Sequence, residues 1–295
     1  MQTPGYQALR EGAAILDLSA RGRIRASGED RKRLLHAMTT NHVQELEPGG
    51  TIYAFFLNAQ GRIQADVWIH AEEDYLLLDV EPEVREKVYA HLDKFIIADD
   101  VTLEDISAST AEIAVEGPAA PAMQQQGVVV SATVTGQPGF RMVVPVEERD
   151  ALIASLQAAG GVPATAGEIL AVRLENGVPR YGDDISDASL VQETQQLQGV
   201  HFNKGCYLGQ EIVERVRSRG QVNRLLSQLR IEGTAIPAPG EKVMAGEQEA
   251  GAVTSAAYSP SGSCVRALAY LRAKFITPEA GLTVGGAVAE VVQQG

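Results

Sequence analysis

The chain has little cysteine, no long apolar run and no excess of positive charge. Cys206 and Cys264 are the only cysteines in 295 residues, which excludes a disulfide framework and fits a reducing compartment. No window reaches the roughly 18 apolar residues of a membrane span, and residues 1–20 lack the pattern of a signal peptide. We therefore expect a cytoplasmic protein that does not enter a membrane.

The net charge of −13 argues against direct binding to nucleic acid, because phosphate contacts require a basic surface. Two stretches depart from this acidity. Residues 21–36 and residues 204–230 each hold six Lys or Arg against two acidic residues. Each stretch is either a local anion site or the solvated face of a helix.

The overall composition is that of an ordinary folded protein. A hydrophobic content of 45% over this length is enough for a large core and favours two or three domains. Residues 51–57 and 62–70 are strand-like runs separated by a four-residue turn that ends in Gly61, and they predict a hairpin. Ser27 and Asp30 have the spacing of a capping box before a helix near 29–41.

The middle of the chain alternates between strand and helix patterns. Strands near 75–80, 101–106, 111–116 and 139–146, with helices near 84–96, 118–126 and 147–159, follow the order β-α-β-β-α-β of a ferredoxin-like lobe. A further helix at 166–176 ends before Gly177. Short strands at 225–231, 250–258, 263–271 and 282–292 then predict a small β-barrel. The fold class is α+β.

Cys206 is the residue with the most evident chemistry. Gly205 and Gly209 let the backbone of its loop approach a ligand, and Lys204 favours the thiolate, which is the reactive form. The alternative is a small core residue. No second cysteine or histidine follows at ligand spacing, so we expect no metal site. Cys264 lies in an apolar run and is expected to fill the core.

The octapeptide Lys-Gly-Cys-Tyr-Leu-Gly-Gln-Glu at 204–211 resembles the signature of the YgfZ-type folate-binding proteins. Upstream, Arg-Leu-Glu-Asn-Gly at 173–177, Tyr181 and Glu193 resemble the pterin-binding stretch of the glycine-cleavage T-protein, in the aminomethyltransferase-like superfamily. The resemblance covers nearly the whole chain. It implies an aminomethyltransferase folate-binding fold, with tetrahydrofolate in a central channel.

The resemblance also implies a domain organisation. Residues 1–221 would form the folate-binding region in two lobes, one from about 1–70 with 165–221 and a ferredoxin-like one over about 71–164. Residues 222–295 would form the C-terminal β-barrel.

The same resemblance assigns roles to particular residues. Cys206 and Lys204 would be the reactive pair, and the pterin-binding carboxylates would be Glu175 or Glu193. The other candidate folate-binding residues are Asp66, Tyr181, Arg215 and Arg217. A carboxylate suits a reduced pterin because the ring offers N–H donors that it can accept in pairs, and arginines suit the anionic glutamate tail.

One departure bears on the activity. The T-protein has a paired Asp-Asp in the first hairpin, whereas this chain has Ala65 and Asp66. Because one-carbon transfer needs an acid or base near the reacting nitrogen, the first hypothesis is a folate-binding protein that assists iron–sulfur cluster assembly or repair. Its partners would be iron–sulfur enzymes or assembly proteins, and its effect on tRNA modification would be indirect.

Two other hypotheses stay open. The second is a folate-dependent aminomethyltransferase or demethylase. The third is a scaffold that keeps the fold without the ligand.

Overall fold

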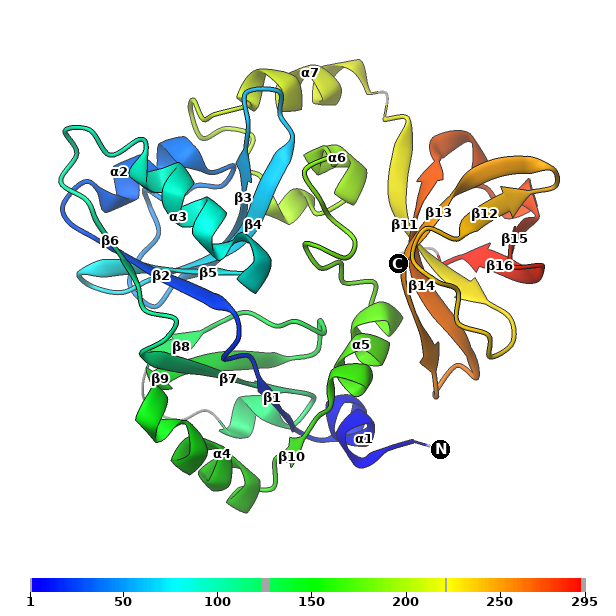
Figure 1. Cartoon of the computed structure of the whole chain (residues 1–295), viewed down its shortest axis with the longest axis horizontal. Helices are drawn as coiled ribbons and strands as arrows, with labels where there is room; N and C mark the ends of the chain where they lie inside the picture. Colours follow the sequence, from blue (N-terminus) through cyan, green and yellow to red (C-terminus); the bar gives the residue numbers. More distant parts are fainter. Residues whose placement is uncertain (1, 124–127, 221, 293–295) are drawn as a thin grey trace.

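The computed structural model describes residues 2–123, 128–220 and 222–292. Two five-stranded sheets and a closed six-stranded barrel form three lobes (Figure 1). Among the described residues, no helix combines the length and the apolar character that crossing a membrane requires.

The first sheet has the strand order β3-β4-β5-β2-β6. Its strands are β2 (Gly22–Ser27), β3 (Thr51–Leu57), β4 (Ile63–Ala71), β5 (Tyr75–Val80) and β6 (Thr102–Asp105). Helices α2 (Arg31–Met38) and α3 (Arg85–Asp93) contribute Leu35 and Leu92 to the apolar core beneath this sheet. Each helix thus buries one side against the strands, as an amphipathic helix does.

The hairpin expected at 51–70 is confirmed as β3 and β4, which pair in antiparallel register. Asn58 begins the turn, where its Oδ1 accepts the N–H groups of Gln60 and Arg62. Gly61 has φ 69°, and a Cβ at this position would lie 2.7 Å from Ile212. Glycine is therefore required both for the turn and for the close approach of helix α7 (Gln210–Arg219).

The second sheet has the order β10-β1-β7-β9-β8. Its strands are β1 (Ala14–Asp17), β7 (Thr110–Glu116), β8 (Val128–Val130), β9 (Gly139–Pro145) and β10 (Val162–Pro163). Helix α4 (Arg149–Ala158) packs on it through Leu156, and helix α1 (Pro4–Glu11) precedes it.

The strands expected to form one ferredoxin-like lobe over 71–164 are divided between these two sheets. β5 and β6 both pair with β2 in the first sheet, whereas β7 and β9 pair with each other in the second. The partners β1 and β2 come from the first 27 residues of the chain. The local pattern identified the strands, but their sheet was decided by pairing with distant segments.

The C-terminal barrel is confirmed, with the closed order β11-β14-β13-β12-β15-β16. Its strands are β11 (Arg224–Ile231), β12 (Lys242–Ala245), β13 (Gln248–Ser259), β14 (Cys264–Arg272), β15 (Leu282–Val284) and β16 (Ala287–Val291). The single strand expected at 282–292 is two strands, because Gly285 and Gly286 turn the chain with φ 56° and 84°. Cys264 is buried in the barrel, as expected.

The helix ends correct two details of the sequence analysis. Ser27 is the last residue of β2 and Asp30 caps α2 without a side-chain hydrogen bond, so the capping box expected there is wrong. A capping box instead joins Thr165 to Glu168 at the start of helix α5 (Ala166–Glu175), which ends before Gly177 as expected. The helix expected at 118–126 is a 3-10 turn over Ala120–Met123, and residues 124–126 lie outside the described residues.

The remaining short helix, α6 (Val191–Thr194), lies between the β3–β4 hairpin and the barrel (Figure 1). Its C-cap residue, Gln195, has φ 59°, and the 3-10 turn Leu197–Gly199 follows. The segment from 188 to 199 thus lies between the first sheet and the barrel and contacts both.

Candidate functional site

A cavity of about 580 Å³ lies between the two sheets and helix α5. The first sheet contributes Tyr53, Asp66 and Trp68, and the second sheet contributes Arg141. The wall from α5 is formed by residues at helical spacing, namely Ala166, Ile169, Leu170 and Arg173. Its volume is in the range of small-molecule sites, and its lining is mostly apolar with a few convergent polar groups.

Asp66 is the carboxylate that strand β4 places on the wall of this cavity. Side chains of a strand alternate between its two faces, so Asp66 and Trp68 share the cavity face of β4, as their two-residue spacing predicts. The hydroxyl of Tyr53, on the neighbouring strand, donates a hydrogen bond of 2.8 Å to Asp66 Oδ2. The rings of Tyr53 and Trp68 lie 5.0 Å apart. Asp66 is therefore held in place with only 9% of its surface exposed.

The surroundings of Asp66 favour its protonated form. Burial is the largest cause and the negative charge of Glu81 adds to it, so the pKa of Asp66 is raised to about 6. The hydrogen bond from Tyr53 and the charge of Arg21 oppose this shift. A carboxyl group with a pKa near neutrality can both take up and release a proton at physiological pH, which suits general acid–base chemistry.

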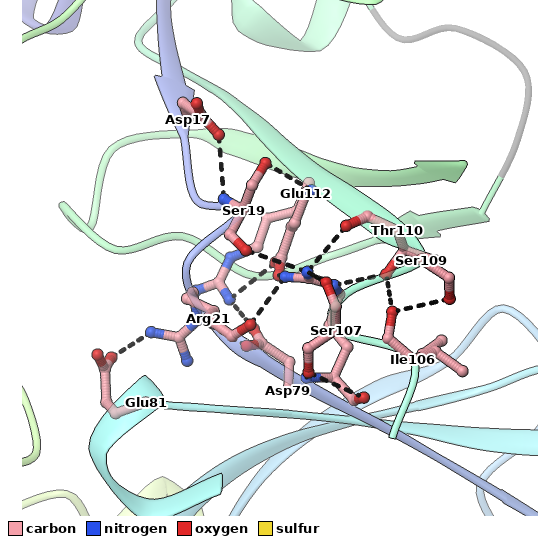
Figure 2. A network of polar contacts seen from close by, with 12 residues as sticks. Asp17, Ser19, Arg21, Asp79, Glu81, Ile106, Ser107, Ser109, Thr110 and Glu112 are labelled. Atoms are coloured by element: carbon pink, nitrogen blue, oxygen red, sulfur yellow. Dashed lines mark hydrogen bonds and ion pairs between the residues drawn. The ribbon is translucent and has the colours of Figure 1, made fainter. Parts of the chain in front are cut away.

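A network of buried charges lies behind the cavity, where β2, β5, β7 and β9 meet. Figure 2 shows Arg21 between Asp79 and Glu81, both of which it pairs with. Arg141 pairs with Asp79 and with Glu112, the latter at 3.4 Å. Arg21, Glu81 and Arg141 also line the cavity. The network therefore links the two sheets and supplies part of the cavity wall.

Arg23 completes this network away from the cavity. It is fully buried, and its guanidinium donates to the carbonyl oxygens of Arg21, Ser107 and Thr110 at 2.7–3.0 Å. Glu112 lies 3.6 Å from it. Burial and the charge of Asp79 raise the pKa of Glu112 to about 7, against the opposing effect of Arg141. Arg21 and Arg23 are thus neither a solvated helix face nor an open anion site.

Ala65 does not lie on the cavity face. It is fully buried in the core of the first sheet, opposite Phe56. The alternation of β4 places residue 65 on the face opposite to Asp66. A carboxylate at position 65 would therefore not enter the cavity, and Ala65 removes no acid or base from it. The alanine at position 65 is therefore no longer an argument against one-carbon transfer.

Glu175 and Tyr181 lie outside the cavity. Glu175 accepts hydrogen bonds from Tyr6 at 2.6 Å and from Ser259 at 2.5 Å, which joins α1 and α5 to the barrel. Because successive helical residues are rotated by about 100°, Glu175 points away from the face of α5 that carries Arg173. The hydroxyl of Tyr181 donates to the backbone oxygen of Gln64, and burial raises the pKa of Tyr181 to about 12.

Glu193, Arg215 and Arg217 are likewise separate from Asp66. Glu193 is buried and forms an ion pair of 3.1 Å with Arg224, beside a second cavity. Arg215 and Arg217 lie on the exposed face of α7. The guanidinium of Arg217 lies 4.4 Å above the ring of Phe202. The structure therefore brings only Asp66, among the residues expected to bind folate, into the central cavity.

Lys204 and Cys206 lie on the loop before α7. Lys204 is buried, and its ammonium donates to the backbone oxygens of His36 and Thr39, the latter at 2.6 Å. Burial lowers the pKa of Lys204 to about 8. Cys206 is free and exposed, as expected, and it does not line the central cavity. Lys204 thus fastens the loop to the end of α2, while the thiol faces outward.

Among the described residues, no group of three His, Cys, Asp or Glu side chains is arranged to hold a metal ion. His42 has ring contacts with both His36 and His201, at 4.6 and 5.1 Å. His36 and His42 lie six residues apart and His201 comes from a distant segment, and both ring contacts are edge-to-face.

Sequence reasoning missed Tyr53, Glu81 and Arg141 as cavity residues. Tyr53 had a usable signal, because the hairpin register places it diagonally opposite Asp66 across two strands. Glu81 follows the buried strand β5, and Arg141 is a lone cation in an apolar strand. Charged residues inside or just after buried strands are seldom placed there without partners.

Comparison with known proteins agrees with this architecture. The GCVT N-terminal domain model matches residues 3–130, and the glycine cleavage T-protein C-terminal barrel domain model matches residues 224–292. An aminomethyltransferase of Geobacillus kaustophilus (strain HTA426) is 30% identical over 87% of this chain and 78% of its own length. The chain belongs to the aminomethyltransferase family.

Other members of this family extend the match. An aminomethyltransferase of Thermus thermophilus (strain ATCC BAA-163) is 30% identical and covers 90% of this chain and 81% of its own length. The crystal structure of glycine cleavage system aminomethyltransferase T from Bartonella henselae has a TM-score of 0.89, covering 98% of this chain and 87% of that one. Its sequence identity of 18% makes this a likeness of fold.

Proposed function

We propose that this protein binds tetrahydrofolate in the central cavity and transfers a one-carbon unit between the folate and an amine. The observation that carries the proposal is Asp66, a buried carboxyl group with a pKa raised to about 6 on the wall of a 580 Å³ cavity. Its relatives named aminomethyltransferase support the same class of reaction. The T-protein resemblance at residues 173–193 supports folate as the ligand through Arg173, which lines the cavity, and not through Glu175, Tyr181 or Glu193, which do not.

The cavity residues fit a reduced pterin. The ring carries N–H donors, and the Asp66 oxygens can accept them while Tyr53 holds the carboxylate in place. Trp68 and Tyr53 supply aromatic surface for the flat ring. When bound, the folate supplies the nitrogens that carry the one-carbon unit. Asp66 then takes up or releases the proton at the reacting amine, and the apolar wall of α5 excludes water.

Turnover by the Asp66→Asn variant tests this proposal. Wild-type protein with tetrahydrofolate and an aminomethylated lipoyl carrier protein should form methylene-tetrahydrofolate, at a rate that rises as Asp66 ionises through pH about 6. Asp66→Asn should reduce the rate by about 10²–10⁴-fold, the usual contribution of a general acid or base. Asp74→Asn, the same change on an exposed turn, is the matched control. Wild-type protein that forms no product, or an Asp66→Asn variant with the full rate, would refute the proposal.

We also propose a second role, in the assembly or repair of iron–sulfur clusters, which the octapeptide favours through its resemblance to YgfZ-type proteins. The supporting observation is Cys206, an exposed free thiol on a loop that the buried Lys204 holds against α2. Such a thiol is accessible to an iron–sulfur enzyme or assembly protein. Effects on tRNA modification would follow indirectly, through enzymes that carry these clusters.

Complementation separates this role from one-carbon transfer. In a strain that lacks the protein, Cys206→Ala should fail to restore iron–sulfur enzyme activities, whereas Cys264→Ala, the change at the buried cysteine, should restore them. Full restoration by Cys206→Ala would exclude a working thiol. The turnover assay on the same variant shows whether the two roles share chemistry.

A further inference from the structure

A second cavity, of about 900 Å³, opens where the β3–β4 turn, the segment before α6 and the barrel meet. We call it the cationic pocket, because its lining includes four cations and one carboxylate, which are Arg62, Arg224, Arg272, Lys274 and Glu193. The chain as a whole carries a net charge of −13. The pocket therefore reverses the sign that prevails over the protein.

Two guanidinium groups are held side by side in this pocket. Arg62 Nη1 and Arg224 Nη2 both donate to the backbone oxygen of Ala188, at 2.6 and 3.1 Å. The guanidinium of Arg224 also lies 4.6 Å above the ring of Tyr270. The contacts fix the orientation of both arginines before any ligand arrives.

The positive charge of the pocket is only partly compensated. Glu193 forms an ion pair with Arg224 at 3.1 Å, and its Oε2 also accepts the backbone N–H of Leu190. Within the described chain, Lys274 has only the neutral side chain of Gln248 as a hydrogen-bond partner. In the antiparallel register of β11 and β14, Arg272 lies directly opposite Arg224. Like charges opposite each other on one face of a sheet repel.

We propose that the cationic pocket is a binding site for an oxyanion with at least two negative charges, contacted by Arg224, Arg272 and Lys274. Carboxylate and phosphate oxygens share the chemistry that these donors recognise. Two kinds of ligand could supply this oxyanion. One is the oligoglutamyl chain of a folate, and this choice rests on the proposed function. The other is a free phosphate compound, and this choice does not depend on the proposed function.

The central cavity and the cationic pocket are lined by residues of the same two chain segments. Asp66 and Arg62 lie four residues apart on the same hairpin, a distance of about 13 Å along an extended strand. On the other side, Glu193 lines the cationic pocket, and Gln196 and Gln198 line the central cavity. The hairpin and residues 193–198 thus contribute side chains to both sites.

Calorimetric titration with pyrophosphate, and with tetrahydrofolate bearing one or three glutamates, tests the proposal. The test variant combines Arg272→Gln with Lys274→Gln, both at exposed positions. The control combines Arg230→Gln with Lys242→Gln, which removes the same two charges from the barrel outside the pocket. The test variant should weaken binding of the oxyanion probe by at least about tenfold, as expected when charge-assisted hydrogen bonds are lost, and the control should not.

The probes distinguish the sources. If wild-type protein prefers three glutamates to one, and the test variant loses that preference, the pocket holds the folate chain. If pyrophosphate binding alone depends on Arg272 and Lys274, the ligand is a separate phosphate compound. If neither probe responds to the test variant, the proposal is wrong. Failure of wild-type protein to bind the monoglutamate would refute the proposed folate function while leaving the pyrophosphate result valid.

Discussion

Arginines cluster in two regions of this molecule, which differ in burial and in how fully carboxylates balance the charge. Behind the central cavity, Arg21, Arg23 and Arg141 are at most 8% exposed, and three carboxylates, Asp79, Glu81 and Glu112, balance them. In the cationic pocket, four cations face solvent with one carboxylate. A buried charge must be matched because its desolvation is costly, whereas an exposed one is screened by water and salt.

This difference separates charges that maintain the fold from charges that are available to a ligand. The guanidinium of Arg23 donates its hydrogen bonds to protein carbonyls, so no N–H group remains for a ligand. Lys274 has one hydrogen bond, to the neutral side chain of Gln248, and Arg272 interacts with Glu249 through its charge, so both have donors left for solvent or an anion. Asp66 is intermediate, since it is buried like the network but faces a cavity. The three cases predict different responses to removal of the charge.

The largest effect on stability is expected from the buried network. Arg23→Met removes the positive charge 3.6 Å from Glu112 and leaves several backbone oxygens without their donor. The free energy of unfolding should fall by about 4 kcal/mol, as when one partner of a buried ion pair is removed. Urea denaturation measures this. Arg25→Met is the matched control on the same strand, because Arg25 is 40% exposed and 3.9 Å from Glu104, and it should cost less than about 1 kcal/mol. Equal losses in both variants would contradict the comparison.

Asp66→Asn should stabilise the protein, but only above acidic pH. The pKa of Asp66 is about 6 in the folded state against an ordinary value of 3.8 for an aspartate, so its ionisation opposes folding progressively as pH rises from about 4 to 6. Above pH 6 the variant escapes this cost and should gain up to about 3 kcal/mol. Below pH 4 the gain should vanish. Urea denaturation at pH 8 and pH 3.5 measures the difference, and a gain at both pH values would exclude ionisation as its cause.

The smallest effect is expected in the cationic pocket. Arg272→Gln removes an exposed cation that faces Arg224 across the barrel strands, so the free energy of unfolding should change by no more than about 0.5 kcal/mol. The change should be a gain, larger at low salt, because repulsion between the two arginines is relieved. Thermal denaturation at two salt concentrations measures it. A clear loss of stability would show that Arg272 maintains the fold.

Local sequence patterns were sufficient for most of the secondary structure. The β3–β4 hairpin, α5 with its end before Gly177, and the barrel strands all follow from apolar periodicity and from turn residues. The pattern was insufficient for the lobes, because the partner of β5 and β6 is β2, more than 45 residues earlier in the chain. Pairing across such distances leaves no local signal.

The candidate site was harder to predict than the fold. Asp66 was identified, yet the sequence could not show that Ala65 faces the core or that Glu175 binds Tyr6 and the barrel. A carboxylate in a motif can be a ligand contact or a link between lobes, and both uses place it among polar residues. For Glu175, only the direction in which its side of helix α5 faces distinguishes a ligand contact from a link between lobes.

The sequence by itself determined the family, the alternation that directs Asp66 and Trp68 to one face of β4, and the exposure of Cys206 between glycines. These depend on residue order and on local backbone geometry. The tertiary structure alone decided which charges meet. Arg21 pairs with Asp79 and Arg224 pairs with Glu193 across 58 and 31 residues, because charges pair wherever the packing of distant strands and loops brings them within a few ångströms.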